Sequence, residues 1–238
     1  LLILIISITR SLILPAFFSV ESYGYWQIYL FYSAYVGIFA LGFNDGIYLR
    51  YGDKDYKELP FAKLRMSIRI FSLMLLVITI LIVFLTNLFI ANGDMRYALI
   101  FSGFNIFVLC LTGVFTHVLQ ITNQLKKYSF FSVADKALVI VTVVLMFFLN
   151  NNNFKLIIII DFLAKVLVLV AMIYFCKELW IGRNVSFSIA FKEVKNNMGV
   201  GVKLLIANLL GMLIIGMGRF LIQVFGKIED FATYSFGI

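Results

Sequence analysis

Residues 68–91 read IRIFSLMLLVITILIVFLTNLFIA, a stretch in which Arg69 is the only charged side chain. A helix rises 1.5 Å per residue, so about 20 apolar residues cross a hydrocarbon core of about 30 Å. This stretch is therefore long enough to cross a bilayer as one helix.

Apolar stretches of the same kind recur along the whole chain. They cover residues 25–41, 97–121, 130–149, 154–176 and 200–225, with a further one opening the chain at 1–18 and another beginning near Phe231. The chain is 63% hydrophobic and 13% charged, whereas charged residues make up about a quarter of a soluble domain. We therefore expect an all-α, polytopic membrane bundle with about seven transmembrane helices and the start of an eighth.

The basic residues lie on alternate connections between these stretches. Thirteen fall on one set: Arg50, Lys54, Lys57, Lys63, Arg65, Arg69, Lys126, Lys127, Lys177, Arg183, Lys192, Lys195 and Lys203. The opposite set holds Arg96, Lys155 and Lys227. Cytoplasmic loops carry the excess of Lys and Arg, so we expect a multi-pass protein of the cell membrane with a cytoplasmic N-terminus. Basic charge placed this way argues against a nucleic-acid surface.

The domain organisation is indicated by one polar segment. Residues 180–198 mix Phe187, Ile189 and Phe191 with Lys192 and Lys195, which predicts an amphipathic cytoplasmic linker. It would join a unit at 1–179 to a unit that begins at 199 and runs to 238. Because Leu rather than Met opens the chain, we also expect it to be a fragment of a longer protein.

Nothing in the sequence predicts catalysis. There is no Gly-rich phosphate loop, no GxSxG and no CxxC, and His117 alone cannot hold a metal. Cys110 and Cys176 have the character of small apolar core residues. We expect neither an enzyme, nor a cofactor, nor a metal site.

Ionisable residues within the predicted spans are the candidate functional residues, because each costs about 2.5–3.5 kcal/mol to insert and normally faces a protein interior or a water-filled cavity. Arg10, Lys165 and Arg219 predict a basic cavity for a polyanionic ligand, since Arg and Lys are the residues that bind phosphate. Asp161 lies four residues before Lys165, on one helix face, so the two can pair. The alternative is that this pair is purely internal and that the arginines extend to the interface.

Other polar residues in or near the spans are further candidates for a cavity, a gate or proton coupling. Asp135 and Lys136 lie in the inner half of the predicted 130–149 span, and Asp45 is expected to make a helix-end or gating contact. A stripe on the 97–121 span either bonds neighbouring helices or lines water; it comprises Thr112, Thr116, Gln120 and Gln124, with His117 beside it as a candidate for proton coupling.

Aromatic residues line one face near the predicted 25–41 span. They are Tyr25, Tyr29, Tyr32, Phe39 and Phe43. An interfacial aromatic belt and stacking of sugar rings both fit this face.

Three segments together resemble the polysaccharide flippases of bacteria, the Wzx-like oligosaccharide exporters. Residues 22–52, SYGYWQIYLFYSAYVGIFALGFNDGIYLRYG, resemble the second-span region of that family. Residues 204–220, LLIANLLGMLIIGMGRF, are similar to the span that opens its second half, and the closing FATYSFGI is similar to the start of the next span. Many members have an acid before the arginine that matches Arg219, whereas this chain has Gly218.

The resemblance implies a multidrug/oligosaccharidyl-lipid/polysaccharide-type exporter with two six-helix lobes, of which this chain would hold the first lobe and the beginning of the second. It implies a lipid-linked oligosaccharide as substrate, membrane lipid around the protein, and polysaccharide polymerase or ligase machinery as partners. Two alternatives stay open: a cation-coupled drug exporter of the same superfamily, and a non-transporting scaffold for a polysaccharide synthase.

Overall fold

The computed structural model describes residue 15 and residues 18–148 and 153–237, with the backbone alone at 135 and 138–148. The predicted first span, 1–18, therefore lies almost wholly outside the described residues. Arg10, within that span, lies outside them. In the described part every regular element is helical. The helices are α2 (Val20–Tyr35), α3 (Phe43–Tyr51), α4 (Phe61–Phe89), α5 (Gly93–Ile121), α6 (Leu125–Phe148), α7 (Phe154–Phe175), α8 (Phe187–Phe225) and α9 (Ile228–Phe236), with short 3₁₀ turns at Val36–Ala40, Tyr56–Glu58 and Lys177–Leu179.

The long helices confirm a membrane-embedded bundle. Among the described residues α4, α5, α7 and α8 are each long and apolar enough to cross a membrane, and the bent α2–α3 pair makes a fifth candidate. Large apolar side chains face outward from α4, among them Val77, Phe84 and Leu88, each more than 60% exposed. Lipid is the solvent for such a surface. The prediction of about seven spans is not confirmed.

The span predicted at 25–41 is broken rather than straight. Leu41 (φ 49°) and Gly42 (φ 78°) are both left-handed, and the chain bends by 59° between Val20–Ala40 and Phe43–Tyr51. Left-handed backbone ends a helix, and Gly adopts it without steric cost. The helical path therefore continues past the predicted end at Leu41, in α3.

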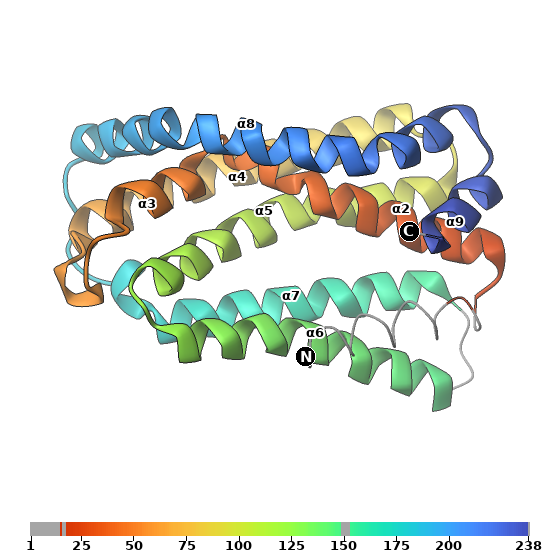
Figure 1. The fold of residues 1–238 in the computed structure, drawn as a ribbon, viewed down its shortest axis with the longest axis horizontal. Helices are drawn as coiled ribbons and strands as arrows, with labels where there is room; N and C mark the ends of the chain where they lie inside the picture. Colours follow the sequence, from red (N-terminus) through yellow and green to blue (C-terminus); the bar gives the residue numbers. More distant parts are fainter. Residues whose placement is uncertain (1–14, 16–17, 149–152, 238) are drawn as a thin grey trace.

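Helix α8 is the longest element and runs the full length of the bundle (Figure 1). Its 39 residues span about 58 Å, nearly twice the hydrocarbon core. The linker predicted at 180–198 is helical from residue 187 onward, because those residues form the first turns of α8. The chain's two prolines are Pro15 and Pro60, so no proline interrupts this helix.

The ends of the bundle differ in charge. The α3–α4, α5–α6 and α7–α8 connections lie at one end and the α4–α5 and α8–α9 connections at the other (Figure 1). The connections that carry most of the basic residues therefore lie at a single end of the bundle, which we call the basic end. We call the opposite one, with Arg96, Lys155 and Lys227, the sparse end.

Candidate functional site

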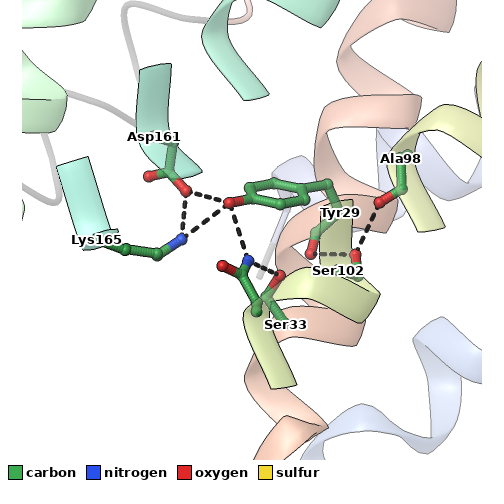
Figure 2. Close-up of polar contacts among 7 residues, drawn as sticks. Tyr29, Ser33, Ala98, Ser102, Asp161 and Lys165 are labelled. Carbon is green, nitrogen blue, oxygen red and sulfur yellow. Dashed lines mark hydrogen bonds and ion pairs between the residues drawn. The ribbon is translucent and has the colours of Figure 1, made fainter. Parts of the chain in front are cut away.

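A buried polar cluster joins three helices in the interior of the bundle (Figure 2). The Tyr29 hydroxyl on α2 donates to Asp161 Oδ2 on α7 at 2.5 Å. It accepts from Lys165 Nζ at 3.1 Å and from Asn105 Nδ2, on α5, at 2.9 Å. A phenol has one donor and two acceptor positions, so these three bonds match its capacity.

Asp161 and Lys165 form an ion pair, as their spacing predicts. Asp161 is 1% exposed and Tyr29 is fully buried. A buried carboxylate is retained only where a counter-charge and hydrogen bonds offset its desolvation, and here Lys165 and Tyr29 supply both. The Lys165 ammonium also lies 5.0 Å from the centre of the Tyr29 ring, within the range of a cation–π contact.

Two serines, Ser33 on α2 and Ser102 on α5, extend the cluster. Asn105 Nδ2 donates to Ser33 Oγ at 2.8 Å. Ser102 Oγ lies 2.9 Å from the Ala98 carbonyl oxygen and 3.1 Å from the Tyr29 carbonyl oxygen. Asn105 Oδ1 is buried and has no hydrogen-bond partner among the described residues, so the cluster keeps one unused acceptor.

Lys165 also reaches a pocket of about 170 Å³ between α5, α6 and α7, which we call the lysine pocket. A second ammonium-bearing side chain, Lys136 of α6, lines the same pocket. Polar lining comes from Thr112, Thr116 and Ser132. Two basic side chains from neighbouring helices thus line one half-open hollow between α5, α6 and α7.

Of the predicted basic triad, only Lys165 and Arg219 lie among the described residues. Arg219 belongs to α8, is half-buried, and its guanidinium lies 3.4 Å from the Ser235 carbonyl oxygen on α9. It is not among the residues that line the lysine pocket. Arg10 lies outside the described residues, and the side chain of Asp135 is not described.

The polar stripe on α5 divides into two parts. Thr112 and Thr116 donate to carbonyl oxygens one turn earlier in their own helix and face the lysine pocket, so they line a hollow instead of bonding a neighbouring helix. Gln120 is exposed. His117 Nδ1 lies 2.9 Å from the Gly113 carbonyl oxygen, which assigns the proton to Nδ1 in the neutral ring.

Asp45 lies in the first turn of α3. A carboxylate there interacts favourably with the helix dipole, which agrees with the helix-end role expected of it. Further along α3, the ring of Tyr48 meets that of His117 edge-on, with 5.6 Å between the ring centres. This contact ties α3 to the basic end of α5.

A second charged cluster, between α3 and α8, was not predicted from the sequence. Arg50 Nη1 lies 2.5 Å from both Glu193 Oε1 and Asn197 Oδ1, and the Tyr51 hydroxyl donates to Glu193 Oε1 at 2.5 Å. Glu193 is 7% exposed, although it lies in the segment predicted to be an amphipathic cytoplasmic linker. The signal was its spacing of four from Asn197, which places both on one face of a helix.

The helices α3 and α8 touch through their backbones, in the most extensive helix–helix contact among the described residues. A Cβ on Gly46 would overlap the Asn197 carbonyl oxygen, and one on Gly201 would overlap the Gly42 carbonyl oxygen. Gly42 and Gly46 form a G-x-x-x-G pattern, which allows close helix approach in membranes. That motif, within GFNDG, could have revealed the crossing.

Two arginines at the start of α4 bind the connection that follows α7. Arg65 donates to the carbonyl oxygens of Glu178 (2.7 Å from Nη2) and Arg183, and Arg69 donates to the Trp180 carbonyl oxygen at 2.8 Å. The Tyr56 hydroxyl donates to Glu178 at 3.1 Å, and burial, with Cys176 and Glu178 nearby, raises the pKa of Tyr56 above its usual range. Basic residues at this end therefore hold the fold together.

No known protein family, curated protein or solved structure matches this chain.

Proposed function

We propose that this chain is part of a membrane transporter that moves a lipid-linked oligosaccharide, through its diphosphate headgroup, from the basic end of the bundle to the sparse end. The observation that carries the proposal is the lysine pocket. Lys136 and Lys165 come from different helices and line the same hollow inside a bundle whose outer surface is apolar. Ionisable residues at such depth mark substrate or ion pathways.

The chemistry of the pocket suits a phosphate group. An ammonium has three donors, and Asp161 and Tyr29 accept from two of those of Lys165. The third remains for an anion that enters the pocket, together with the Lys136 ammonium and the Ser132 hydroxyl. Charge-assisted bonds of this kind offset the desolvation of an anion.

The Asp161–Tyr29–Asn105 cluster fixes where the Lys165 ammonium lies. It anchors the charge on α7 to α2 and α5, so a shift of either helix changes how Lys165 meets the pocket. Transport by alternating access needs such a link between helix packing and a central site. In this proposal Arg10 and Arg219 are further cations along the same route.

The resemblance of residues 22–52 and 204–220 to oligosaccharide flippases supports the same class of substrate. Under the orientation that the basic loops favour, the basic end is cytoplasmic. A headgroup loaded there would leave at the sparse end, while the hydrocarbon tail stays in the bilayer.

A cation-coupled drug exporter is the second candidate, because Asp161 gives the bundle a buried carboxylate. Exporters of cationic drugs need an acid in the cavity. Here Lys165 already neutralises that acid, and Lys136 adds a further base to the same hollow. The balance of charge therefore favours an anionic ligand.

Depleting the full-length protein in its own cell tests the proposal. We expect undecaprenyl-pyrophosphate-linked glycan to accumulate in the cytoplasmic leaflet. Normal pools of lipid-linked glycan together with altered drug tolerance would favour the exporter. Loss of the lipid-linked glycan itself would favour a scaffold for its synthesis.

A further inference from the structure

Two hollows follow one another along the sparse half of the bundle, on the faces of α2 and α5. The first, which we call the polar hollow, has a volume of about 330 Å³ and lies at the sparse end. The second, which we call the apolar groove, has about 390 Å³ and lies between α2, α4 and α5. Neither is lined by Lys136 or Lys165, so both are separate from the lysine pocket.

The two hollows share the same helix faces. The lining residues pass from Tyr25 and Ile28 of α2 in the polar hollow to Tyr32 of α2 and to Val36 and Phe39 of the following 3₁₀ turn in the apolar groove. The spacings of three and four residues between Tyr25, Ile28 and Tyr32 place these three on one face of α2. On α5 the lining passes likewise from Met95 to Leu99, Gly103 and Ile106. The hollows are therefore successive parts of one path.

A single hydrogen bond joins the two parts. The Tyr32 hydroxyl, from the apolar groove, donates to Gln223 Oε1, from the polar hollow, at 2.7 Å. This bond places a polar boundary where the apolar lining ends. In an amphipathic ligand the polar headgroup likewise gives way to an apolar chain. The boundary between headgroup and chain would lie at the Tyr32–Gln223 bond.

The length and position of the path fit one membrane leaflet. From Met95 to Ile106 the rise of α5 is about 16 Å, and half of the hydrocarbon core is about 15 Å. The groove opens to the membrane side, because Leu85 lines it and is 36% exposed. Hydrocarbon is the solvent at that depth.

Charges of both signs line the polar hollow. Lys227 and Glu229, both exposed, lie on either side of Ile228 at the start of α9. An ammonium suits a phosphate and a carboxylate suits an amine, so the pair complements a headgroup that carries both charges. A purely anionic headgroup would meet Glu229 as a like charge.

We propose that the polar hollow and the apolar groove together bind one phospholipid with a zwitterionic, amine-bearing headgroup, in the leaflet at the sparse end. One chain of the lipid fills the groove between α2, α4 and α5. Its phosphate meets Lys227, its amine meets Glu229, and the Tyr32–Gln223 bond lies at the depth of the glycerol backbone. This site is independent of the transport proposal.

Native mass spectrometry of the full chain in detergent tests the site, with phosphatidylethanolamine and phosphatidylglycerol of identical acyl chains added at equal, low concentration. We expect one retained phosphatidylethanolamine, preferred over phosphatidylglycerol by about tenfold, the effect of losing one charge-assisted contact. Equal retention of the two lipids would overturn the proposal. So would displacement of phosphatidylethanolamine by an equal concentration of undecaprenyl phosphate, which would make the carrier lipid the occupant.

Two variants with matched controls separate the headgroup from the chain. Glu229→Gln should remove the preference between the two lipids, whereas Asp53→Asn, an exposed acid at the basic end, should keep it. Leu99→Trp should fill the groove and lower retention at least about tenfold, whereas Leu81→Trp, on the exposed face of α4, should not. The site would be refuted if Glu229→Gln kept the wild-type preference between the two lipids and Leu99→Trp kept the wild-type retention. Glu229 is exposed, so Glu229→Gln still tests the site if Leu99→Trp fails to fold.

Discussion

Gly46 of α3 lies directly against the carbonyl oxygen of Asn197 in α8, with no room for a Cβ between them. Gly42, one turn earlier, is also close to α8: a Cβ there would lie 2.6 Å from the Val202 nitrogen. The bent half of the broken span and the longest helix are therefore joined backbone to backbone. The Arg50–Glu193 pair closes the same crossing at the basic end.

Adding a methyl group at this crossing should separate the helices. We expect Gly46→Ala to lower the free energy of unfolding by about 1–3 kcal/mol, the usual cost of overpacking. Gly199→Ala is the matched control, because a Cβ there meets nothing within 4 Å and alanine favours a helix by up to about 1 kcal/mol. Thermal unfolding in detergent measures both. Equal stability of the two variants would mean that α3 and α8 are not in backbone contact.

The Arg50–Glu193 pair should be coupled energetically. Glu193→Gln removes the charge that faces Arg50 and weakens the acceptor of the Tyr51 hydroxyl, so we expect a loss of about 2 kcal/mol. Because Arg50→Met removes the same interaction, the double variant should cost less than the sum of the single ones. A double-mutant cycle by thermal unfolding measures the coupling. Additive effects would show that the pair is not formed.

The Asp161–Lys165 pair has separable structural and functional consequences. Asp161→Asn leaves a buried ammonium without its counter-charge, and we expect a loss of about 3–5 kcal/mol. Asp161→Asn combined with Lys165→Gln removes both charges, so most of the stability should return. Export should not return, because the lysine pocket then lacks one of its two cations. Restored export in the stable double variant would contradict a role for Lys165 in transport.

The arginine contacts at the start of α4 should control the α7–α8 connection. Arg65→Lys keeps the charge but loses the planar fork that reaches the carbonyl oxygens of Glu178 and Arg183. We expect faster hydrogen exchange at residues 177–186 and no change in α5. Lys63→Gln, at an exposed position two residues away, is the control. Unchanged exchange in Arg65→Lys would show that these bonds do not order the connection.

The sequence predicted the helical class, the gathering of basic residues at one end and the Asp161–Lys165 pair, because each follows from apolar length, loop charge or a spacing of four. It did not predict the break at Leu41–Gly42, since hydropathy continues through the bend. From the sequence, Tyr29 was assigned only to an aromatic face, because a hydropathy pattern does not reveal which residues a tyrosine hydroxyl bonds to. Its place between Asp161 and Asn105 depends on the packing of α2, α5 and α7.

The unbroken course of α8 was missed for the opposite reason. Its first turns are polar and resemble a surface segment, yet Glu193 and Asn197 are buried by Arg50 and Tyr51 of α3. Lys136 was recognised as a charge within a span, but its meeting with Lys165 requires the packing of α6 against α7. Long-range partners of this kind leave no periodic signal in the chain.

Export by a Lys136→Gln variant tests the central claim most directly. Cells depleted of the full-length protein would be complemented with wild type, Lys136→Gln or Lys195→Gln, the last at an exposed position near the start of α8. Lipid-linked glycan in the outer leaflet would be measured with a membrane-impermeant label. We predict that Lys136→Gln lowers outer-leaflet glycan at least about tenfold, as loss of a charge-assisted contact to the substrate would, while Lys195→Gln matches wild type. Wild-type amounts in Lys136→Gln would contradict binding of the headgroup in the lysine pocket.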